Sequence, residues 1–350
     1  MIATASYGGG HEHIAEALAS SLRASRPGSV GVVALDLLER AAPRSSALAR
    51  VAYAAGESFF PDGNGDLARL ARGDGGDPVL RELIAGGVAS ADAALSALRP
   101  DAVLAVHPVA AAIASEVSAR LGCRVACVLP DLEMGRAWVH PACDLWFVGT
   151  PEARDALAAR EVAWSAITVS GVPLDVPAPS RDWGARRRDL GLDDRFTALV
   201  PDSGRGDAAE LAEALAAHGI QVAVTGGSRS RSAGSSLVRR LGSDVSPIDA
   251  VHAADLLVCA RCGVAQWLAP AAGVPVIVTE PVPSLERASV DLLVTAGVAL
   301  QARDVEEAAG RAAYLSRHPD RLARMSDDAA SLGRPAAARA VAERVLAALG

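Results

Sequence analysis

The chain has 350 residues, of which 51% are hydrophobic and 3% aromatic, and its formal net charge is −7. This length suits two domains, and the acidic balance argues against a general nucleic-acid binder, which would present a basic face. No apolar run approaches the roughly 20 residues that span a bilayer, and the first residues lack a secretory pattern. We therefore expect a cytoplasmic protein, with contact to a membrane surface left open.

The first residues predict a strand, a tight turn and a helix. An apolar run from Ile2 ends in Gly8-Gly9-Gly10-His11, after which apolar residues recur every three or four positions. The glycines would let backbone N–H groups face a ligand at the positive end of the new helix. His11 would then stand at the mouth of a ligand site, and a cap or an anion contact is the alternative role for it.

Residues 41–78 interrupt the alternation of strands and helices. They carry turn residues and three aromatic side chains, Tyr53, Phe59 and Phe60. A long irregular insertion is usually functional or mobile, and exposed aromatics there would suit an apolar acceptor or a membrane surface. Packing of the three side chains within a local helix pair is the alternative.

Two buried strands bring further polar groups toward His11. The apolar run at 101–106 ends in His107, and the run at 123–129 is followed by Asp131. Continuous apolar runs are typical of parallel strands, whose carboxyl ends share one edge of a sheet. His107 and Asp131 would orient His11 or a substrate there, and packing at a strand end is the alternative for each.

A proline-rich stretch at 173–180 has the composition of a linker, and the strand–helix alternation then restarts. We divide the chain into a first domain at 1–175, a linker at 176–186 and a second domain at 187–350, whose last helix can cross back to the first. Two α/β units of similar size imply two doubly wound, Rossmann-like domains that face each other across a ligand cleft.

The five cysteines predict no metal or redox site. Cys259-Ala-Arg-Cys262 has suitable spacing, but no second ligand pair accompanies it. An odd number of cysteines in a chain of this length suggests reduced thiols. We therefore interpret this pair as small core residues.

Taken together, these features resemble the two-domain GT-B glycosyltransferases. Within them the similarity is to the branch of monogalactosyldiacylglycerol synthases, processive diacylglycerol glucosyltransferases and the MurG lipid II enzyme. In chain order the shared cues are Ser6 to His11, Val106-His107-Pro108, Asp131-Leu132 with Trp138 and His140, Gly171-Val172-Pro173, and Gly273-Val274-Pro275. The order and spacing of these cues carry the resemblance, because none of them is specific alone.

The resemblance implies inverting transfer of a sugar from a nucleotide-diphosphate sugar, in the first place a UDP-sugar, to a lipid or an apolar natural-product acceptor. No metal and no other cofactor is implied, because glycine N–H groups can meet the diphosphate charge. A neutral imidazole suits removal of the acceptor proton near pH 7. The implied catalytic residues are His11, His107 and Asp131; the acceptor residues are Tyr7, Tyr53, Phe59 and Phe60; the donor residues are Gly10, Ser203, Gly204, Gly206, Gly226, Gly263, Gln266 and Glu286.

The chain departs from the family at the donor site. The family carries a Glu, which binds both ribose hydroxyls, five residues before the glycine that corresponds to Gly273, and here that position is Leu268. Leucine accepts no hydrogen bond, so the ribose contact is lost, at a cost of ~1.5–3 kcal/mol, or is made elsewhere. A divergent transferase, a degenerate binding or partner subunit, and a sugar-nucleotide epimerase on the same fold all stay open.

Overall fold

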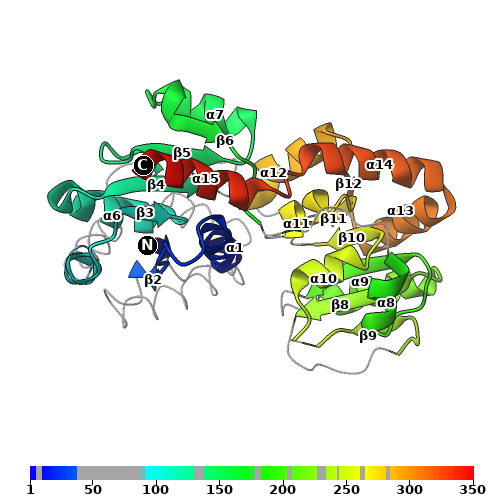
Figure 1. Ribbon diagram of the computed structural model, residues 1–350. Helices are drawn as coiled ribbons and strands as arrows, with labels where there is room; N and C mark the ends of the chain where they lie inside the picture. The colour runs from blue at the N-terminus through cyan, green and yellow to red at the C-terminus, as the bar shows by residue number, and fades with distance from the viewer. Residues whose placement is uncertain are drawn as a thin grey trace. The chain divides into compact units, whose positions relative to one another are not determined.

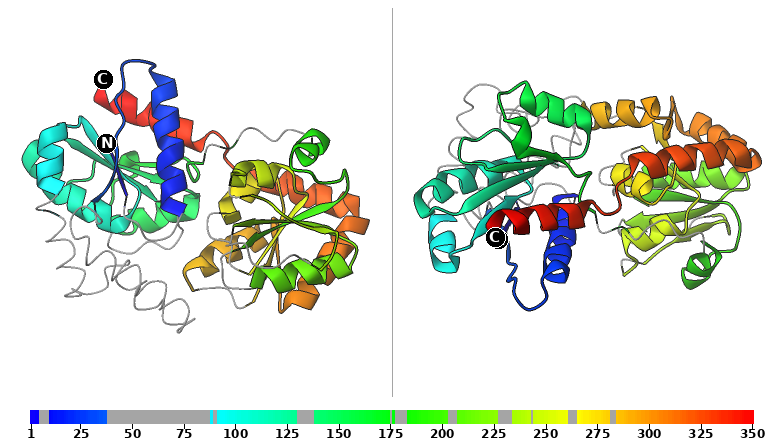
Figure 2. Two further views of the ribbon diagram at one scale, coloured as in Figure 1. Left: turned by 90° about the horizontal axis from the view of Figure 1, so that it is seen from below. Right: turned by 45° about the horizontal axis from the view of Figure 1, so that its top comes forward.

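The computed structural model describes residues 1–4, 10–37, 88, 91–129, 138–174, 176, 183–202, 207–226, 234–242, 244–260, 265–280 and 284–350. Contacts divide the chain into two compact units, one of Met1–Asp175 with Ala336–Gly350 and one of Val176–Pro335. The final helix α15 (Ala337–Leu349) belongs to the first unit and packs against α1 (Gly10–Ser25). Figure 1 and Figure 2 show the two helices side by side, α1 in blue and α15 in red.

The first unit is built on a six-stranded parallel sheet of order β2-β1-β3-β4-β5-β6. Its strands are β1 (Ile2–Thr4), β2 (Ala34–Asp36), β3 (Ala102–Ala105), β4 (Arg124–Leu129), β5 (Leu145–Val148) and β6 (Ile167–Val169). The chain leaves β1 for β2 on one side and later continues from β3 to β4 on the other. This reversal makes the sheet doubly wound, as the sequence predicts.

Helices cover the first sheet and complete its core. Besides α1 and α15 they are α6 (Pro108–Leu121), α7 (Pro151–Ala158) and the 3-10 helix η2 (Trp164–Ala166). Buried side chains of α6 and α7 form one apolar cluster with β3, β4 and β5. Local sequence sets the ends of α6, because Pro108 occupies its first turn and Gly122 follows its last with a φ of 70°.

The second unit has its own six-stranded parallel sheet, of order β12-β11-β10-β7-β8-β9. Its strands are β7 (Thr197–Asp202), β8 (Gln221–Gly226), β9 (Val238–Arg240), β10 (Leu256–Cys259), β11 (Val276–Thr279) and β12 (Ala299–Ala302). Here the order reverses between β7 and β10, which lie next to each other. The prediction of two doubly wound, Rossmann-like sheets is therefore confirmed.

Seven helices are described in the second unit, and α9 and α13 form its main apolar cluster with the sheet. They are α8 (Trp183–Asp189), α9 (Asp207–Ala217), α10 (Pro247–His252), α11 (Ala265–Ala271), α12 (Ser284–Thr295), α13 (Val305–Arg317) and α14 (Pro319–Leu332). Helix α11 contains a proline, Pro270, and packs against α14.

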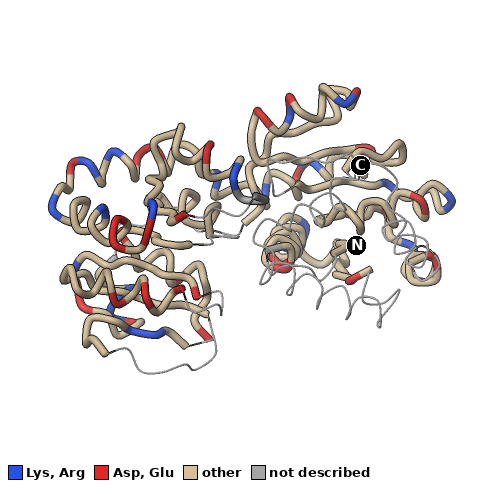
Figure 3. The backbone as a smooth tube through the Cα atoms, turned by 180° about the vertical axis from the view of Figure 1, so that it is seen from behind, with Lys and Arg blue, Asp and Glu red and all other residues tan. Residues whose placement is uncertain are grey.

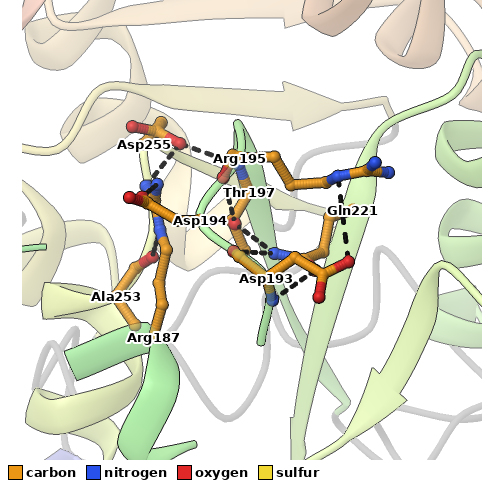
Figure 4. A network of polar contacts seen from close by, with 8 residues as sticks. All are labelled: Arg187, Asp193, Asp194, Arg195, Thr197, Gln221, Ala253 and Asp255. Carbon is orange, nitrogen blue, oxygen red and sulfur yellow. Dashed lines mark hydrogen bonds and ion pairs between the residues drawn. The ribbon is translucent and has the colours of Figure 1, made fainter. Parts of the chain in front are cut away.

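A buried polar network joins α8 to the amino ends of β7, β8 and β10 (Figure 4). Arg187 donates from Nε to the carbonyl of Ala253 at 2.9 Å and from Nη2 to the Oδ2 of Asp255 at 2.6 Å. The N–H of Thr197 donates to the same carboxylate oxygen at 2.7 Å, and the side-chain amide of Gln221 donates to the Thr197 hydroxyl at 2.8 Å. Burial raises the pKa of Asp255, and the charge of Arg187 opposes that shift. The network therefore joins the amino ends of these strands, at the edge of the sheet opposite to the carboxyl ends.

The cysteine prediction is partly wrong. Cys123, Cys127 and Cys143 are free, as expected, but the buried Cys259 at the end of β10 is disulfide-bonded. The remaining cysteine of the sequence, Cys262, lies outside the described residues. The prediction was wrong because five cysteines cannot all form disulfides, but an odd number still permits one disulfide bond.

Charged residues of both signs are interspersed along the described helices (Figure 3). This arrangement agrees with the absence of a strongly basic composition in the sequence. None of the described helices combines the length and the apolar character that crossing a membrane requires.

Candidate functional site

Two histidines meet where the first sheet reverses its strand order. Strand β1 ends at Thr4, α1 begins at Gly10, and His11 lies in its first turn. Strand β3 ends at Ala105, and His107 is the N-cap of α6. Because β1 and β3 are parallel neighbours, both helices start from the carboxyl edge of the sheet. The two imidazole rings stand edge to face, with centroids 4.9 Å apart and planes at 74°.

A short hydrogen bond fixes the tautomer of His11. Its Nδ1 lies 2.6 Å from the main-chain oxygen of Val106. A carbonyl oxygen can only accept, so Nδ1 carries the proton and Nε2 keeps a lone pair. Burial lowers the pKa of His11 below the ordinary 6.5, and the bond to Val106 offsets part of this shift. The ring is therefore neutral at pH 7 and can take up a proton at Nε2.

The opposite tautomer forms at His107. Its Nδ1 accepts the N–H of Val109 at 3.2 Å, which satisfies one of the unpaired donors in the first turn of α6. The neutral ring therefore carries its proton on Nε2. Burial, together with the neighbouring His11, holds the pKa of His107 well below 6.5. His107 thus stays neutral beside His11 and supplies no positive charge at pH 7.

Gly226 closes the carboxyl end of β8 in the second unit. Its φ is +81°, and a β-carbon at this position would lie 2.6 Å from the main-chain oxygen of Asp202. Asp202 ends β7 and forms an ion pair with Arg240 of β9 at 3.0 Å. Glycine is therefore required here so that the neighbouring strand ends can approach, whether or not a ligand binds beside them.

A second ion pair lies at the carboxyl edge of β11, and sequence reasoning did not identify it. Glu280 follows β11 directly, and its two oxygens accept from the guanidinium of Arg287 in α12 at 3.0 and 3.4 Å. The side-chain amide of Gln301 lies 3.5 Å from the same carboxylate. The sequence signal that could have identified this ion pair is an acidic residue, Glu280, directly after a buried strand. Glu286, which was predicted instead, lies in the first turn of α12.

The helix that follows β10 buries two polar side chains. Gln266 is 4% exposed and Trp267 is 9% exposed. Neither Oε1 of Gln266 nor Nε1 of Trp267 has a hydrogen-bond partner in the part of the chain that the structure describes. The next residue, Leu268, is buried and apolar.

The structure brings His11 and His107 together in the first unit and places Gly226, Gln266 and Glu286 at or after the ends of parallel strands of the second. Gly226 is the last residue of β8, Gln266 lies in the helix that follows β10, and Glu286 lies in the helix that follows β11. Nine other predicted residues lie outside the described residues: Tyr7, Tyr53, Phe59, Phe60, Asp131, Ser203, Gly204, Gly206 and Gly263.

Comparison with known proteins adds a family match and a set of similar folds. Residues 11–174 match the family described as monogalactosyldiacylglycerol (MGDG) synthase. No protein with a curated description matches the chain by sequence.

Three similar solved structures share the fold, and two of them are described as glycosyltransferases. MurG from Acinetobacter baumannii has a TM-score of 0.60 and 16% identity over 99% of each chain. The calicheamicin glycosyltransferase CalG4 has a TM-score of 0.61 and 18% identity over 100% of this chain and 98% of its own. SnogD from Streptomyces nogalater has a TM-score of 0.60 and 18% identity over 100% and 99%.

Proposed function

We propose that the chain is a GT-B glycosyltransferase of the MGDG synthase and MurG-like branch, and that it transfers a sugar, with inversion, from a UDP-sugar to a lipid or apolar natural-product acceptor. The proposal includes no metal ion and no other cofactor. The observation that carries it is the hydrogen bond from His11 Nδ1 to Val106. This bond supports a neutral imidazole whose Nε2 is ready to act as a base.

The reaction needs one proton transfer and one displacement. The acceptor hydroxyl gives its proton to Nε2 of His11, and its oxygen forms the new bond to the anomeric carbon. The bond from that carbon to the diphosphate oxygen breaks, and the nucleoside diphosphate leaves with the bonding electrons. Attack on the face opposite the leaving group inverts the anomeric centre.

His107 has a positioning role in this proposal. Its edge-to-face contact with His11 and its bond to Val109 support a fixed orientation of both rings. A base that is already oriented avoids the cost of ordering it during the reaction. Asp131 remains a proposed partner of the pair, and Tyr7, Tyr53, Phe59 and Phe60 remain proposed acceptor contacts.

The donor is assigned to the second unit. In doubly wound sheets, ligands bind outside the carboxyl ends of the strands where the strand order reverses, which here is between β7 and β10. The proposed contacts are backbone N–H groups of glycines after β7, β8 and β10, together with Gln266 and Glu286. The names of the relatives support the acceptor class, since one family is described by a diacylglycerol product and CalG4 by calicheamicin.

A binding or partner subunit is the second candidate. The buried Leu268 favours it, because leucine at this position cannot supply the carboxylate with which the family's Glu binds the ribose hydroxyls. A sugar-nucleotide epimerase is the third, and in a hydrolysing form, in which water takes up the sugar, it would release UDP without any acceptor.

Mass spectrometry of products formed from a panel of nucleotide sugars and a lipid extract tests the proposal. We expect a glycosylated product that depends on both substrates, together with micromolar binding of UDP in calorimetry. Absence of nucleotide binding together with absence of product would favour the binding subunit. UDP release without acceptor would favour the epimerase.

A further inference from the structure

Two cysteines of the first unit lie with their sulfur atoms close together. Cys127, in β4, is completely buried, and Cys143, two residues before β5, is 8% exposed. Their Sγ atoms are 3.2 Å apart, and both cysteines are free. This separation is too long for an S–S bond of about 2.0 Å and fits a hydrogen bond between two thiols. The two residues are 16 positions apart in the chain, so spacing alone does not identify the pair.

Main-chain contacts around Cys143 hold the two sulfurs in this arrangement. The N–H of Cys143 donates to the carbonyl of His140 at 3.0 Å. The next residue, Asp144, bonds twice to Val125 of β4, because its N–H donates to the main-chain oxygen at 2.8 Å and its Oδ2 accepts the N–H at 3.0 Å. Val125 and Cys127 are on the same strand. The position of Cys143 beside Cys127 is therefore fixed without a covalent bond between them.

A surface cavity of about 440 Å³ reaches the residues on either side of Cys143. Ala142 and Asp144 line it, together with the partly exposed Cys123. A water molecule takes up about 30 Å³ in the liquid, so the cavity admits a small oxidant such as hydrogen peroxide. Cys127 has no exposed surface, and Cys143 is therefore the sulfur of the pair that an oxidant meets first.

Protonation also distinguishes the two sulfurs. The hydrogen bond to Cys143 and burial raise the pKa of Cys127 well above the ordinary 9.0. Cys127 therefore keeps its proton at pH 7 and donates it toward the sulfur of Cys143. Cys143 is thus the acceptor of the pair as well as its more exposed member, and both observations favour it as the first sulfur to be oxidised.

We propose that Cys127 and Cys143 form an oxidation site at which a peroxide converts two thiols into a disulfide. The sulfur of Cys143 attacks one peroxide oxygen, the O–O bond breaks, and the thiol proton leaves with the other oxygen as water. The sulfur of Cys127 then attacks the resulting sulfenic acid, the S–O bond breaks, and its proton leaves with that oxygen in a second water. Two thiols and one hydrogen peroxide thus give one disulfide and two waters.

The bond would tie β4 to the segment that enters β5. It closes a loop of 16 positions, and such a cross-link stabilises a fold mainly by restricting the unfolded chain. Strand β4 also pairs with β3, where Cys127 lies opposite Ala105, so the bond stabilises the middle of the first sheet. The oxidation site is independent of the proposed transfer reaction, and failure of either leaves the other standing.

Peptide mapping of the full chain tests the site directly. The protein is treated with hydrogen peroxide, remaining thiols are blocked with iodoacetamide under denaturing conditions, and the chain is cut with trypsin. Arginines place the three free cysteines in different peptides, with Cys123 in 121–124, Cys127 in 125–136 and Cys143 in 137–154. We expect peptides 125–136 and 137–154 as one linked species that dithiothreitol separates, with 121–124 linked to neither.

Calorimetric melting measures the effect of the bond. Peroxide-treated wild type should melt about 6–12 °C above the untreated chain in the transition of the first unit. Cys143→Ala should show no such rise, and Cys127→Ala repeats the test in case one variant fails to fold. Cys123→Ser is the matched control, because it removes a free cysteine outside the pair, and it should keep both the linked peptides and the rise.

Three results would overturn the site. Unlinked peptides 125–136 and 137–154 with both thiols intact would show that the pair is only part of the apolar core. Sulfinic acid at Cys143 without a link would show that Cys127 does not react with the sulfenic acid. Linked peptides with the same melting behaviour in wild type and Cys143→Ala would contradict the stabilising cross-link.

Discussion

His11 donates its Nδ1 proton to the main-chain oxygen of Val106, 2.6 Å away and 95 positions along the chain. Val106 is itself tied into the sheet, because its N–H donates to the carbonyl of Ala3 at 3.0 Å. The orientation of the imidazole is therefore set by the pairing of β1 with β3. Such second contacts determine which ring nitrogen of a histidine remains basic.

We predict that the acid limb of kcat/KM lies below pH 6.5. Burial lowers the pKa of His11, so its base form persists at pH values where an exposed histidine is already half protonated. Activity should fall only when the pH drops through that lowered pKa. Initial rates with the UDP-sugar identified in the product screen, measured from pH 5 to 8, check this. A limb clearly above pH 6.5 would point to a different base.

Replacing His107 with asparagine separates its capping role from its contact with His11. Asparagine is a good N-cap and can still accept a hydrogen bond from the N–H of Val109. The free energy of unfolding at pH 7 should therefore change by no more than about 1 kcal/mol. Transfer should slow in kcat with KM nearly unchanged, because the ring beside His11 is lost. Steady-state kinetics and urea unfolding check both effects, and normal kcat would reduce His107 to a cap.

The same substitution, His107→Asn, should make the free energy of unfolding less dependent on pH between pH 7 and pH 5. In the wild type the unfolded His107 binds a proton below pH 6.5, whereas the folded one resists it because its pKa is lowered. The unfolded state then binds more protons, so stability is lost as the pH falls below 6.5. His107→Asn should lose less stability than wild type between pH 7 and pH 5. An equal loss would contradict the buried neutral ring.

Arg187→Leu should destabilise the second unit by about 3–5 kcal/mol, because it leaves Asp255, whose side chain is only 18% exposed, without its cation. Arg186→Leu is the control, since Arg186 pairs at 3.5 Å with an Asp249 side chain that is 58% exposed and should cost less than about 1 kcal/mol. Burial already raises the pKa of Asp255, and removing Arg187 raises it further. The folded variant then takes up a proton more readily than the unfolded chain, so its deficit should shrink as the pH falls. Denaturant unfolding at pH 7 and pH 5 measures both.

Gly226→Ala should cost more stability than Gly219→Ala. Both glycines have positive φ, +81° and +78°, and alanine there costs about 1–2 kcal/mol. A β-carbon at Gly226 would also meet the carbonyl of Asp202, whereas one at Gly219 meets nothing within 4 Å. Thermal unfolding compares the two, and UDP affinity should fall only in Gly226→Ala. Equal stability losses would contradict the close approach of β7 and β8.

Much of the fold was accessible from the sequence because buried parallel strands have long apolar runs and turns rich in Gly and Pro. The two doubly wound sheets were predicted for this reason. The proximity of His11 and His107 could also be anticipated, since both follow strands whose carboxyl ends share an edge. Their tautomers could not, because these depend on contacts with Val106 and Val109 that exist only in three dimensions.

The rest of the second unit shows where sequence reasoning stops. Glu280 and Arg287 are seven positions apart, and only the three-dimensional placement of α12, which packs against β12, makes them partners. The unpaired Oε1 of Gln266 is a property of its surroundings, which no residue pattern contains. The disulfide at Cys259 was missed because an odd number of cysteines still permits one bond.

The most direct test of the account is the turnover of His11→Ala. If His11 takes the acceptor proton, kcat should fall by ~10²-fold or more while the melting temperature and UDP affinity stay near wild type. His218→Ala, which removes a half-exposed histidine of the second unit, should retain full activity. Near-normal turnover of a folded His11→Ala chain would contradict the assignment of His11 as the base.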